Sequence, residues 1–186
     1  MLNSRCLMQF GILLLLMHFC DLRSTVAHEG HDHSHETTPV TIERSTYKHF
    51  QSILSIYQET YLNLIKGQLS SIPVLAQILL DTADKGIHSE SKGPGRHLMQ
   101  HIHQGAQRLR LAQGLQETQE GFASISEAVI PFFKSWPNQL KSNKLKIYQC
   151  REHDKYWLQS QGTLPACPYA SDKFSNCSDI REAGEE

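Results

Sequence analysis

Apolar side chains recur every three or four residues from about residue 42 to residue 135, and this spacing limits the folds open to the chain. Side chains at such intervals line one face of an α-helix. The first run predicts a helix over residues 42–69. Its apolar positions are Phe50, Ile53, Leu54, Tyr57, Tyr61, Leu64 and Ile65.

Three further helices follow from the same spacing. The second is expected over residues 71–85, with Pro73 in its first turn and Gly86 at its end, because proline suits the start of a helix and glycine its end. A third begins near Arg96 and a fourth spans residues 117–135. Four amphipathic helices with short connections predict an all-α fold, an antiparallel bundle of about four helices.

After the fourth helix the composition changes. Residues 144–178 contain three cysteines, Trp157 and three tyrosines, without helical spacing. We therefore expect an irregular, Cys- and aromatic-rich C-terminal cap on the bundle, with a short strand as an option over residues 144–150. The bundle domain and its cap are expected to span residues 42–180, and residues 181–186 to form an acidic tail.

The first 27 residues have the layout of a cleavable signal peptide. Arg5 supplies a positive charge, the apolar run is densest over residues 10–17, and small side chains at Thr25 and Ala27 precede the expected cut. A membrane anchor is the alternative, but charged residues end the apolar run well short of the ~20 residues that a spanning helix needs. We therefore expect a mature protein that starts at His28, has no membrane span and is periplasmic or secreted.

The charge balance of the mature chain argues against nucleic acid as a partner. With Arg5, Arg23 and Asp21 removed, residues 28–186 carry 16 Lys and Arg against 18 Asp and Glu, a formal charge of −2. A protein that holds nucleic-acid phosphates needs a basic surface, which this composition does not predict.

Residues 28–41 are polar and are expected to form a flexible tail. The tail contains four histidines, whose neutral imidazoles suit Cu(II), Ni(II) and zinc, and the neighbouring carboxylates favour a cation. With pKa values near ~6.5, the imidazoles should release metal as the pH falls below roughly 6. The alternative is a solvated linker whose histidines bind nothing. The candidate metal ligands are His28, His31, His33 and His35.

The cap cysteines allow two interpretations. A disulfide between Cys150 and Cys177 would stabilise the fold by roughly 3 kcal/mol through loop closure. Alternatively, two or three thiolates bind Cu(I) or zinc, with Cys150 and Cys177 as the candidate ligands. The cysteine spacing matches no zinc motif, so both interpretations stay open.

The third predicted helix carries a second candidate ligand group. His97 and His101 are four residues apart, as are Met99 and His103, so each pair projects from one helical face. The simpler interpretation is that these residues border or fill the core.

Motifs for catalysis are missing from the sequence. It contains no Gly-rich phosphate loop, no nucleophile elbow and no HExxH motif. Cys150 and His153 are close in sequence, but no oxyanion element or orienting acid accompanies them. We therefore expect a protein that is not an enzyme.

The cap residues resemble the ending of a bacterial domain family. The similarity covers about residues 47–179, and its motifs are Tyr148-Gln149-Cys150, Trp157-Leu158, Pro168-Tyr169, Cys177 and a helical segment over residues 122–130. This periplasmic family, a domain of unknown function, is found alone and fused to adaptor (membrane-fusion) subunits of heavy-metal (copper or silver) efflux pumps. The resemblance implies a helical bundle, export and an association with copper or related heavy metals.

The chain departs from the family pattern at several potential ligand positions. Arg151-Glu152 stands where the family has Pro-Met, and Phe174 stands at the second methionine position. Loss of both thioethers removes soft ligands for Cu(I), whereas Cys167, in place of an asparagine, adds one.

These features predict an exported heavy-metal-binding protein that buffers or delivers copper, or alternatively zinc, near an efflux system. The tail histidines are the first ligands expected, followed by Cys150 and Cys177 as a clamp or a soft site. The alternative is a non-catalytic interaction module that docks on an efflux adaptor, a pump or another envelope protein, with incidental metal binding.

Overall fold

The computed structural model describes residue 40 and residues 42–135, 145–170 and 180–182. The first of its two compact units, residues 1–36, lies wholly outside this part. The predicted signal peptide and several candidate ligands therefore fall outside the described residues. These ligands are His28, His31, His33, His35 and Cys177.

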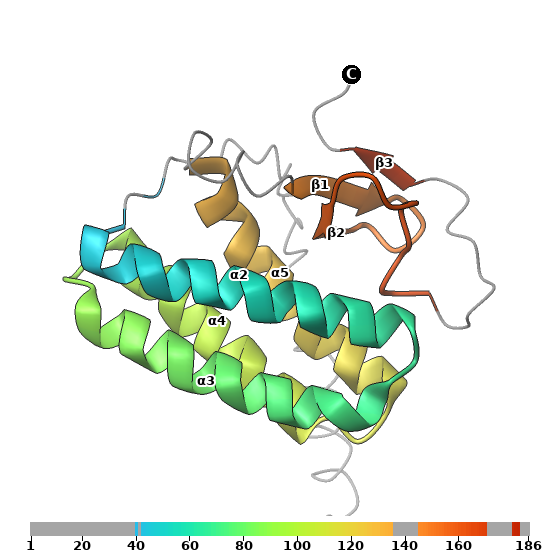
Figure 1. The fold of residues 1–186 in the computed structure, drawn as a ribbon, viewed down its shortest axis with the longest axis horizontal. Helices are drawn as coiled ribbons and strands as arrows, with labels where there is room; N and C mark the ends of the chain where they lie inside the picture. The colour runs from blue at the N-terminus through green and yellow to red at the C-terminus, as the bar shows by residue number, and fades with distance from the viewer. Residues whose placement is uncertain (1–39, 41, 136–144, 171–179, 183–186) are drawn as a thin grey trace, which may run out of the picture. The chain divides into compact units, whose positions relative to one another are not determined.

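The described residues form four α-helices, and the prediction of a mostly helical fold is confirmed. Each helix packs against the next one along the chain (Figure 1). The helices are α2 (Arg44–Ile65), α3 (Ile72–Ser89), α4 (Pro94–Leu111) and α5 (Leu115–Ser135), and a 3-10 turn, η2 (Leu69–Ser71), precedes α3.

Neighbouring helices run antiparallel. The hydroxyl of Ser45, at the start of α2, donates a hydrogen bond to the carbonyl of Ser89, the last residue of α3 (3.0 Å). Between α4 and α5, Gly105 lies against Ile125 whereas Gly121 lies against Leu109, so the contacts run in opposite directions along the two helices. A Cβ atom on Gly121 would lie 2.8 Å from the Leu109 Cα atom. Glycine therefore permits a close approach of the two backbones.

Aromatic rings join α2 to α5 in the core. The ring centroids of Phe50 and Phe132 are 4.7 Å apart, and those of Tyr57 and Phe122 are also 4.7 Å apart. All four side chains are buried. Ring pairs at such separations stabilise a core beyond the area they bury.

Several helix ends differ from the expected ones, and α2 ends at Ile65 and not at residue 69. Helix α3 continues through Gly86 to Ser89, and Gly86 faces Met99, whose Sδ atom would lie 2.9 Å from an added Cβ. Gly86 thus serves packing and does not end the helix. Helix α4 starts at Pro94, which occupies the first turn, where its missing N–H is tolerated.

The C-terminal segment forms a three-stranded antiparallel sheet, which corrects the expected all-α fold with an irregular cap. The strand order is β2-β1-β3. Only the option of a strand over residues 144–150 anticipated this, and β3 crosses the expected boundary after residue 180. The strands are β1 (Leu145–Cys150), β2 (Lys155–Ser160) and β3 (Ile180–Glu182).

Pairing across strands stabilises this sheet, and such pairing has no signature in the spacing of apolar residues along one segment. Tyr148 of β1 lies opposite Trp157 of β2, and their rings stack with centroids 5.9 Å apart. Aromatic residues favour a pleated, half-buried surface when such a partner is present. The partner comes from another segment, so the spacing within one segment does not reveal it.

Helix α2 covers the outer edge of β2. The backbone N–H of Leu158 donates to the Tyr57 hydroxyl (3.2 Å), and the Leu158 carbonyl accepts from the Gln58 side-chain amide (2.9 Å). Unpaired backbone groups at a sheet edge invite pairing with other chains unless they are covered. The two α2 side chains therefore satisfy both outward-facing backbone groups of Leu158 on this edge strand.

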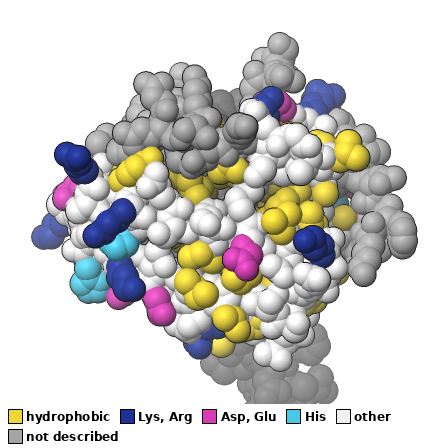
Figure 2. Space-filling view, viewed as in Figure 1, with side chains coloured by type: hydrophobic (Ala, Val, Ile, Leu, Met, Phe, Trp, Pro, Cys, Tyr) yellow, Lys and Arg dark blue, Asp and Glu magenta, His cyan; other side chains and the backbone are white. Residues whose placement is uncertain are grey.

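Lys and Arg side chains are interspersed with Asp and Glu on the face of the molecule shown in Figure 2. This mixture agrees with the near-neutral composition of the chain. Within the ranges that the structure describes, no helix is long and apolar enough to cross a membrane.

Candidate metal centre

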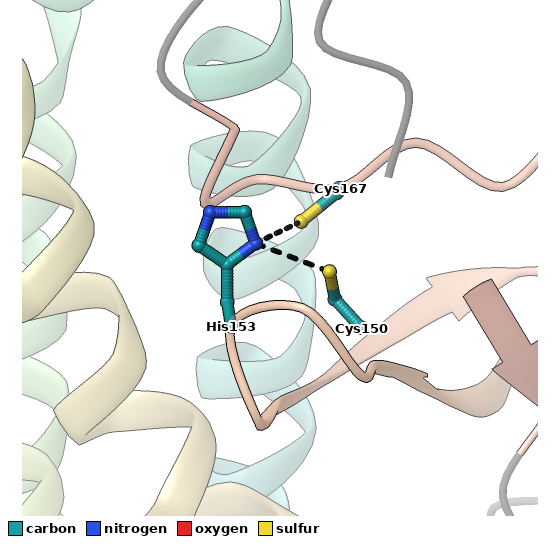
Figure 3. Close-up of side chains that lie close together, drawn as sticks. All are labelled: Cys150, His153 and Cys167. Carbon is teal, nitrogen blue, oxygen red and sulfur yellow. Dashed lines mark hydrogen bonds between the residues drawn. The ribbon is translucent and has the colours of Figure 1, made fainter. Parts of the chain in front are cut away.

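Three potential ligands converge at the β1–β2 hairpin (Figure 3). The Nδ1 atom of His153 lies 3.1 Å from the Sγ atom of Cys150 and 3.9 Å from the Sγ atom of Cys167. All three ligand atoms lie within 4.8 Å of one another. This is the one group of three or more His, Cys, Asp or Glu ligands found among the described residues.

The hairpin itself brings His153 to Cys150. Cys150 ends β1 opposite Lys155, the first residue of β2, so residues 151–154 form a tight turn. Asp154 has a φ of 47°, a left-handed conformation that asparagine and aspartate tolerate better than most residues. The turn therefore places His153 beside Cys150, the last residue of β1.

Contacts with the preceding strand and α2 hold the segment before Cys167. The buried Gln159 side chain accepts hydrogen bonds from the Tyr61 hydroxyl (2.6 Å) and the Ala166 backbone N–H (3.3 Å). The Tyr61 hydroxyl is also placed 2.9 Å from the Ala166 carbonyl. The residue before Cys167, Ala166, is therefore held by the side chains of Tyr61 and Gln159.

Helix α5 holds the segment that follows Cys167. The Gln119 side-chain amide donates to the carbonyls of Pro168 (3.0 Å) and Ala170 (2.8 Å). The Tyr169 hydroxyl donates to the carbonyl of Tyr156 (2.9 Å). With both flanks contacted, Cys167 is held close to the hairpin turn.

Burial differs among the three ligands. Cys150 has no exposed surface, whereas His153 and Cys167 are half-buried. Burial raises the pKa of the Cys167 thiol, and the nearby Glu152 carboxylate adds to the rise, although backbone hydrogen bonds from Tyr169 and Ala170 oppose it. Without a cation, the thiol of Cys167 is therefore favoured over its thiolate.

Two sulfur atoms and one imidazole nitrogen form a soft ligand set that suits Cu(I) or zinc. When two sulfurs bind the same ion at about 2.3 Å each, they lie no more than about 4.6 Å apart. Since the ligand atoms already lie within 4.8 Å, a small inward movement completes this geometry. The donor set therefore fits either ion.

Cys150 is disulfide-bonded in this structure, whereas Cys167 is a free thiol. The partner of Cys150 lies outside the described residues, so the expected Cys150–Cys177 pairing stays a prediction. A disulfide sulfur is not a thiolate and is a poor metal ligand. Metal binding by all three residues therefore requires reduction of Cys150.

The structure brings the candidate ligand Cys150 together with Cys167, which the sequence suggested as an added soft ligand, and with His153, which was not predicted to bind metal. The Cys-x-x-His spacing of Cys150 and His153 was the available signal, because a tight turn places such residues side by side. On α4, Met99 is buried in the core, whereas His97 and His101 are exposed. The simpler interpretation of that helix therefore holds for Met99.

Comparison with known proteins adds no relative to this picture. No family model matches the chain, and no curated protein or solved structure is significantly similar to it. The resemblance to the efflux-associated family therefore stays a prediction based on the cap and helix motifs.

Proposed function

We propose that this protein is an exported heavy-metal-binding protein that buffers or delivers a soft ion, copper or zinc, near an efflux system. The observation that supports metal binding is the convergence of Cys150, His153 and Cys167. Export is supported by the layout of residues 1–27, and the association with efflux by the family resemblance of the cap. Copper is favoured over zinc by that resemblance alone.

Binding proceeds by exchange of protons for the ion. In the reduced protein, Cys150 and Cys167 lose their thiol protons to the metal as it binds, and His153 contributes its Nδ1 lone pair. Cys150 is inaccessible to water, but His153 and Cys167 are half-buried. One side of the site is therefore accessible, as transfer of an ion to another protein requires.

The tail histidines supply a second ligand set of different chemistry. His28, His31, His33 and His35 offer borderline nitrogen ligands, which suit Cu(II) and zinc better than Cu(I). Their binding does not depend on reduction of Cys150. The two ligand sets therefore differ in the oxidation state of copper that they favour: the sulfur site favours Cu(I), and the tail histidines favour Cu(II).

Competition with a chromophoric chelator tests the sulfur site. The full chain, reduced under anaerobic conditions, is titrated with Cu(I) and separately with zinc. Cys167→Ser, Cys150→Ser and His153→Gln are each expected to weaken binding at least about tenfold, since each removes one of three ligands. The matched control is His88→Gln, which removes an exposed histidine on α3 and should leave affinity unchanged.

The same titration separates the two ligand sets. Deletion of residues 28–36 should remove Cu(II) binding and leave Cu(I) binding intact, whereas disulfide formation at Cys150 should do the reverse. Equal affinity in the wild type and all three site variants would rule out the sulfur site as the metal-binding function.

A further inference from the structure

We propose that Cys167 carries out thiol–disulfide exchange with Cys150, so that the existing disulfide of Cys150 is replaced by a Cys150–Cys167 bond. This activity goes beyond metal binding, because it needs no ion and operates in the oxidised protein. The structure places a free thiol, a disulfide sulfur and an imidazole in one cluster.

The sulfur atoms of Cys150 and Cys167 lie close together. Exchange requires a thiolate to reach one sulfur of a disulfide and form a bond of about 2.05 Å with it. The two Sγ atoms already lie within 4.8 Å of one another. Bond formation requires this separation to shorten, and the contacts of Gln119 and Gln159 with the flanking backbone keep Cys167 near Cys150.

Burial of Cys150 restricts which thiols can reach its sulfur. The Sγ atom of Cys150 belongs to a residue with no exposed surface, so a thiol from solution has little access to it. Cys167 approaches from within the fold, from the segment that follows β2. Exchange at Cys150 is therefore expected to favour the internal thiol over external thiols.

His153 supplies the proton acceptor. Its Nδ1 atom contacts both sulfurs, as the two dashed lines in Figure 3 show. In the neutral tautomer that carries its hydrogen on Nε2, Nδ1 can accept the proton of the Cys167 thiol. The resulting imidazolium lies beside both the attacking sulfur and the sulfur under attack.

The step balances without an external oxidant or reductant. The Cys167 thiolate forms a bond to Cys150 Sγ, and the bond between Cys150 and its original partner breaks. The partner sulfur leaves with the electron pair and takes a proton from solvent, while His153 returns its proton to solvent. Cys167 is oxidised, the partner cysteine is reduced, and the number of disulfides is unchanged.

Disulfide mapping of the metal-free, oxidised full chain tests the exchange. The protein is held with a chelator at about pH 8, where thiolates form readily, then quenched with acid, blocked at its free thiols, digested and analysed by mass spectrometry. We expect a Cys150–Cys167 linked peptide to appear with time, together with a newly blocked thiol on the former disulfide partner of Cys150. Its absence after prolonged incubation would overturn the proposal.

A second protein shows whether the two cysteines can pair at all. In a full chain with Cys6, Cys20 and Cys177 each changed to Ser, oxidised glutathione should convert Cys150 and Cys167 into an internal disulfide, with no lasting glutathione adduct. A stable adduct beside a free thiol would also overturn the proposal, provided that circular dichroism shows the helices to be intact.

Histidine variants separate chemistry from structure. His153→Gln should slow the appearance of the linked peptide at least about tenfold, as expected for loss of a general base, whereas His88→Gln should not change it. An unchanged rate in His153→Gln overturns the assignment of His153 as proton acceptor. The exchange test uses metal-free, oxidised protein, whereas the metal titration uses reduced protein. A failure of the exchange would therefore not affect the proposed metal-binding function.

Discussion

The hydroxyl of Tyr57 on α2 accepts a hydrogen bond from the backbone N–H of Leu158 on β2, with 3.2 Å between the two atoms. The same hydroxyl lies 2.7 Å from the Oγ atom of Ser126 on α5. Burial raises the pKa of Tyr57 well above its usual value, so the group stays a neutral hydroxyl. One buried side chain thus joins two helices to the strand that follows the hairpin turn.

Tyr57→Phe should lower the free energy of unfolding by about 1–3 kcal/mol, because it leaves the buried N–H of Leu158 without its acceptor. Urea denaturation followed by circular dichroism measures this change. Tyr47→Phe is the matched control, since its hydroxyl bonds to the exposed side chain of Gln51, and it should change stability by less than about 0.5 kcal/mol. Equal effects of the two substitutions would contradict the role assigned to Tyr57.

Gln159→Leu should release the segment that carries Cys167. The substitution removes the acceptor for Tyr61 and Ala166, as well as the amide that donates to Thr163 Oγ1 (2.8 Å) and the Leu164 carbonyl (3.0 Å). We expect a loss of about 1–3 kcal/mol in stability and faster labelling of the Cys167 thiol by iodoacetamide.

The control for this variant is Gln116→Leu, which alters an exposed amide that donates to the Glu120 carboxylate on the same helix (3.1 Å). It should leave both stability and thiol labelling close to wild type. If Gln159→Leu labels Cys167 no faster than this control, the segment is held by other contacts.

Gly121→Ala should destabilise the packing of α4 on α5. An added Cβ would lie 2.8 Å from the backbone N and Cα atoms of Leu109, neither of which can rotate away. Overpacking of this kind costs about 1–3 kcal/mol, measured as a lower denaturation midpoint. Gly114→Ala is the control because no atom lies within 4 Å of its added Cβ. A neutral Gly121→Ala would show that the helices can separate at little cost.

The Cys167 thiol should react with iodoacetamide more slowly in the folded protein than in urea at every pH below its raised pKa. A raised pKa lowers the fraction of thiolate, the reactive form, at a given pH. The folded-state rate should therefore keep rising with pH after the rate in urea has levelled off. The sample is metal-free protein with Cys6, Cys20, Cys150 and Cys177 each changed to Ser, so that Cys167 is the one thiol and has no disulfide with which to exchange. Parallel pH curves for the two states would show that restricted access alone slows the reaction.

The helices could be predicted from sequence because their signal is local. Residues such as Phe50, Ile53 and Tyr57 lie on one helical face whatever the rest of the chain does, and their spacing alone indicates a helix. Gly86 shows the limit of this reasoning. Its ability to end a helix is a local property, whereas in the structure it lies inside α3, where it packs against Met99 of α4.

The sheet and the metal centre depend on contacts between distant segments. β1 and β2 are stabilised by a cross-strand pair, Tyr148 with Trp157, and by α2 side chains about a hundred positions earlier in the chain. A periodicity analysis cannot detect such partners, because each segment contains half of the pattern. The expected fold class was therefore correct for the helices but missed the C-terminal sheet.

The sequence by itself determined the helical core and presented Cys150 as a candidate ligand, because apolar spacing and ligand chemistry belong to each segment alone. Only the tertiary structure decided which ligands meet. Cys167 reaches Cys150 and His153 because Gln159 of β2 and Gln119 of α5 contact the backbone on either side of it. The proximity of two sulfurs and one imidazole is therefore a consequence of packing, and the metal binding and disulfide exchange proposed here depend on it.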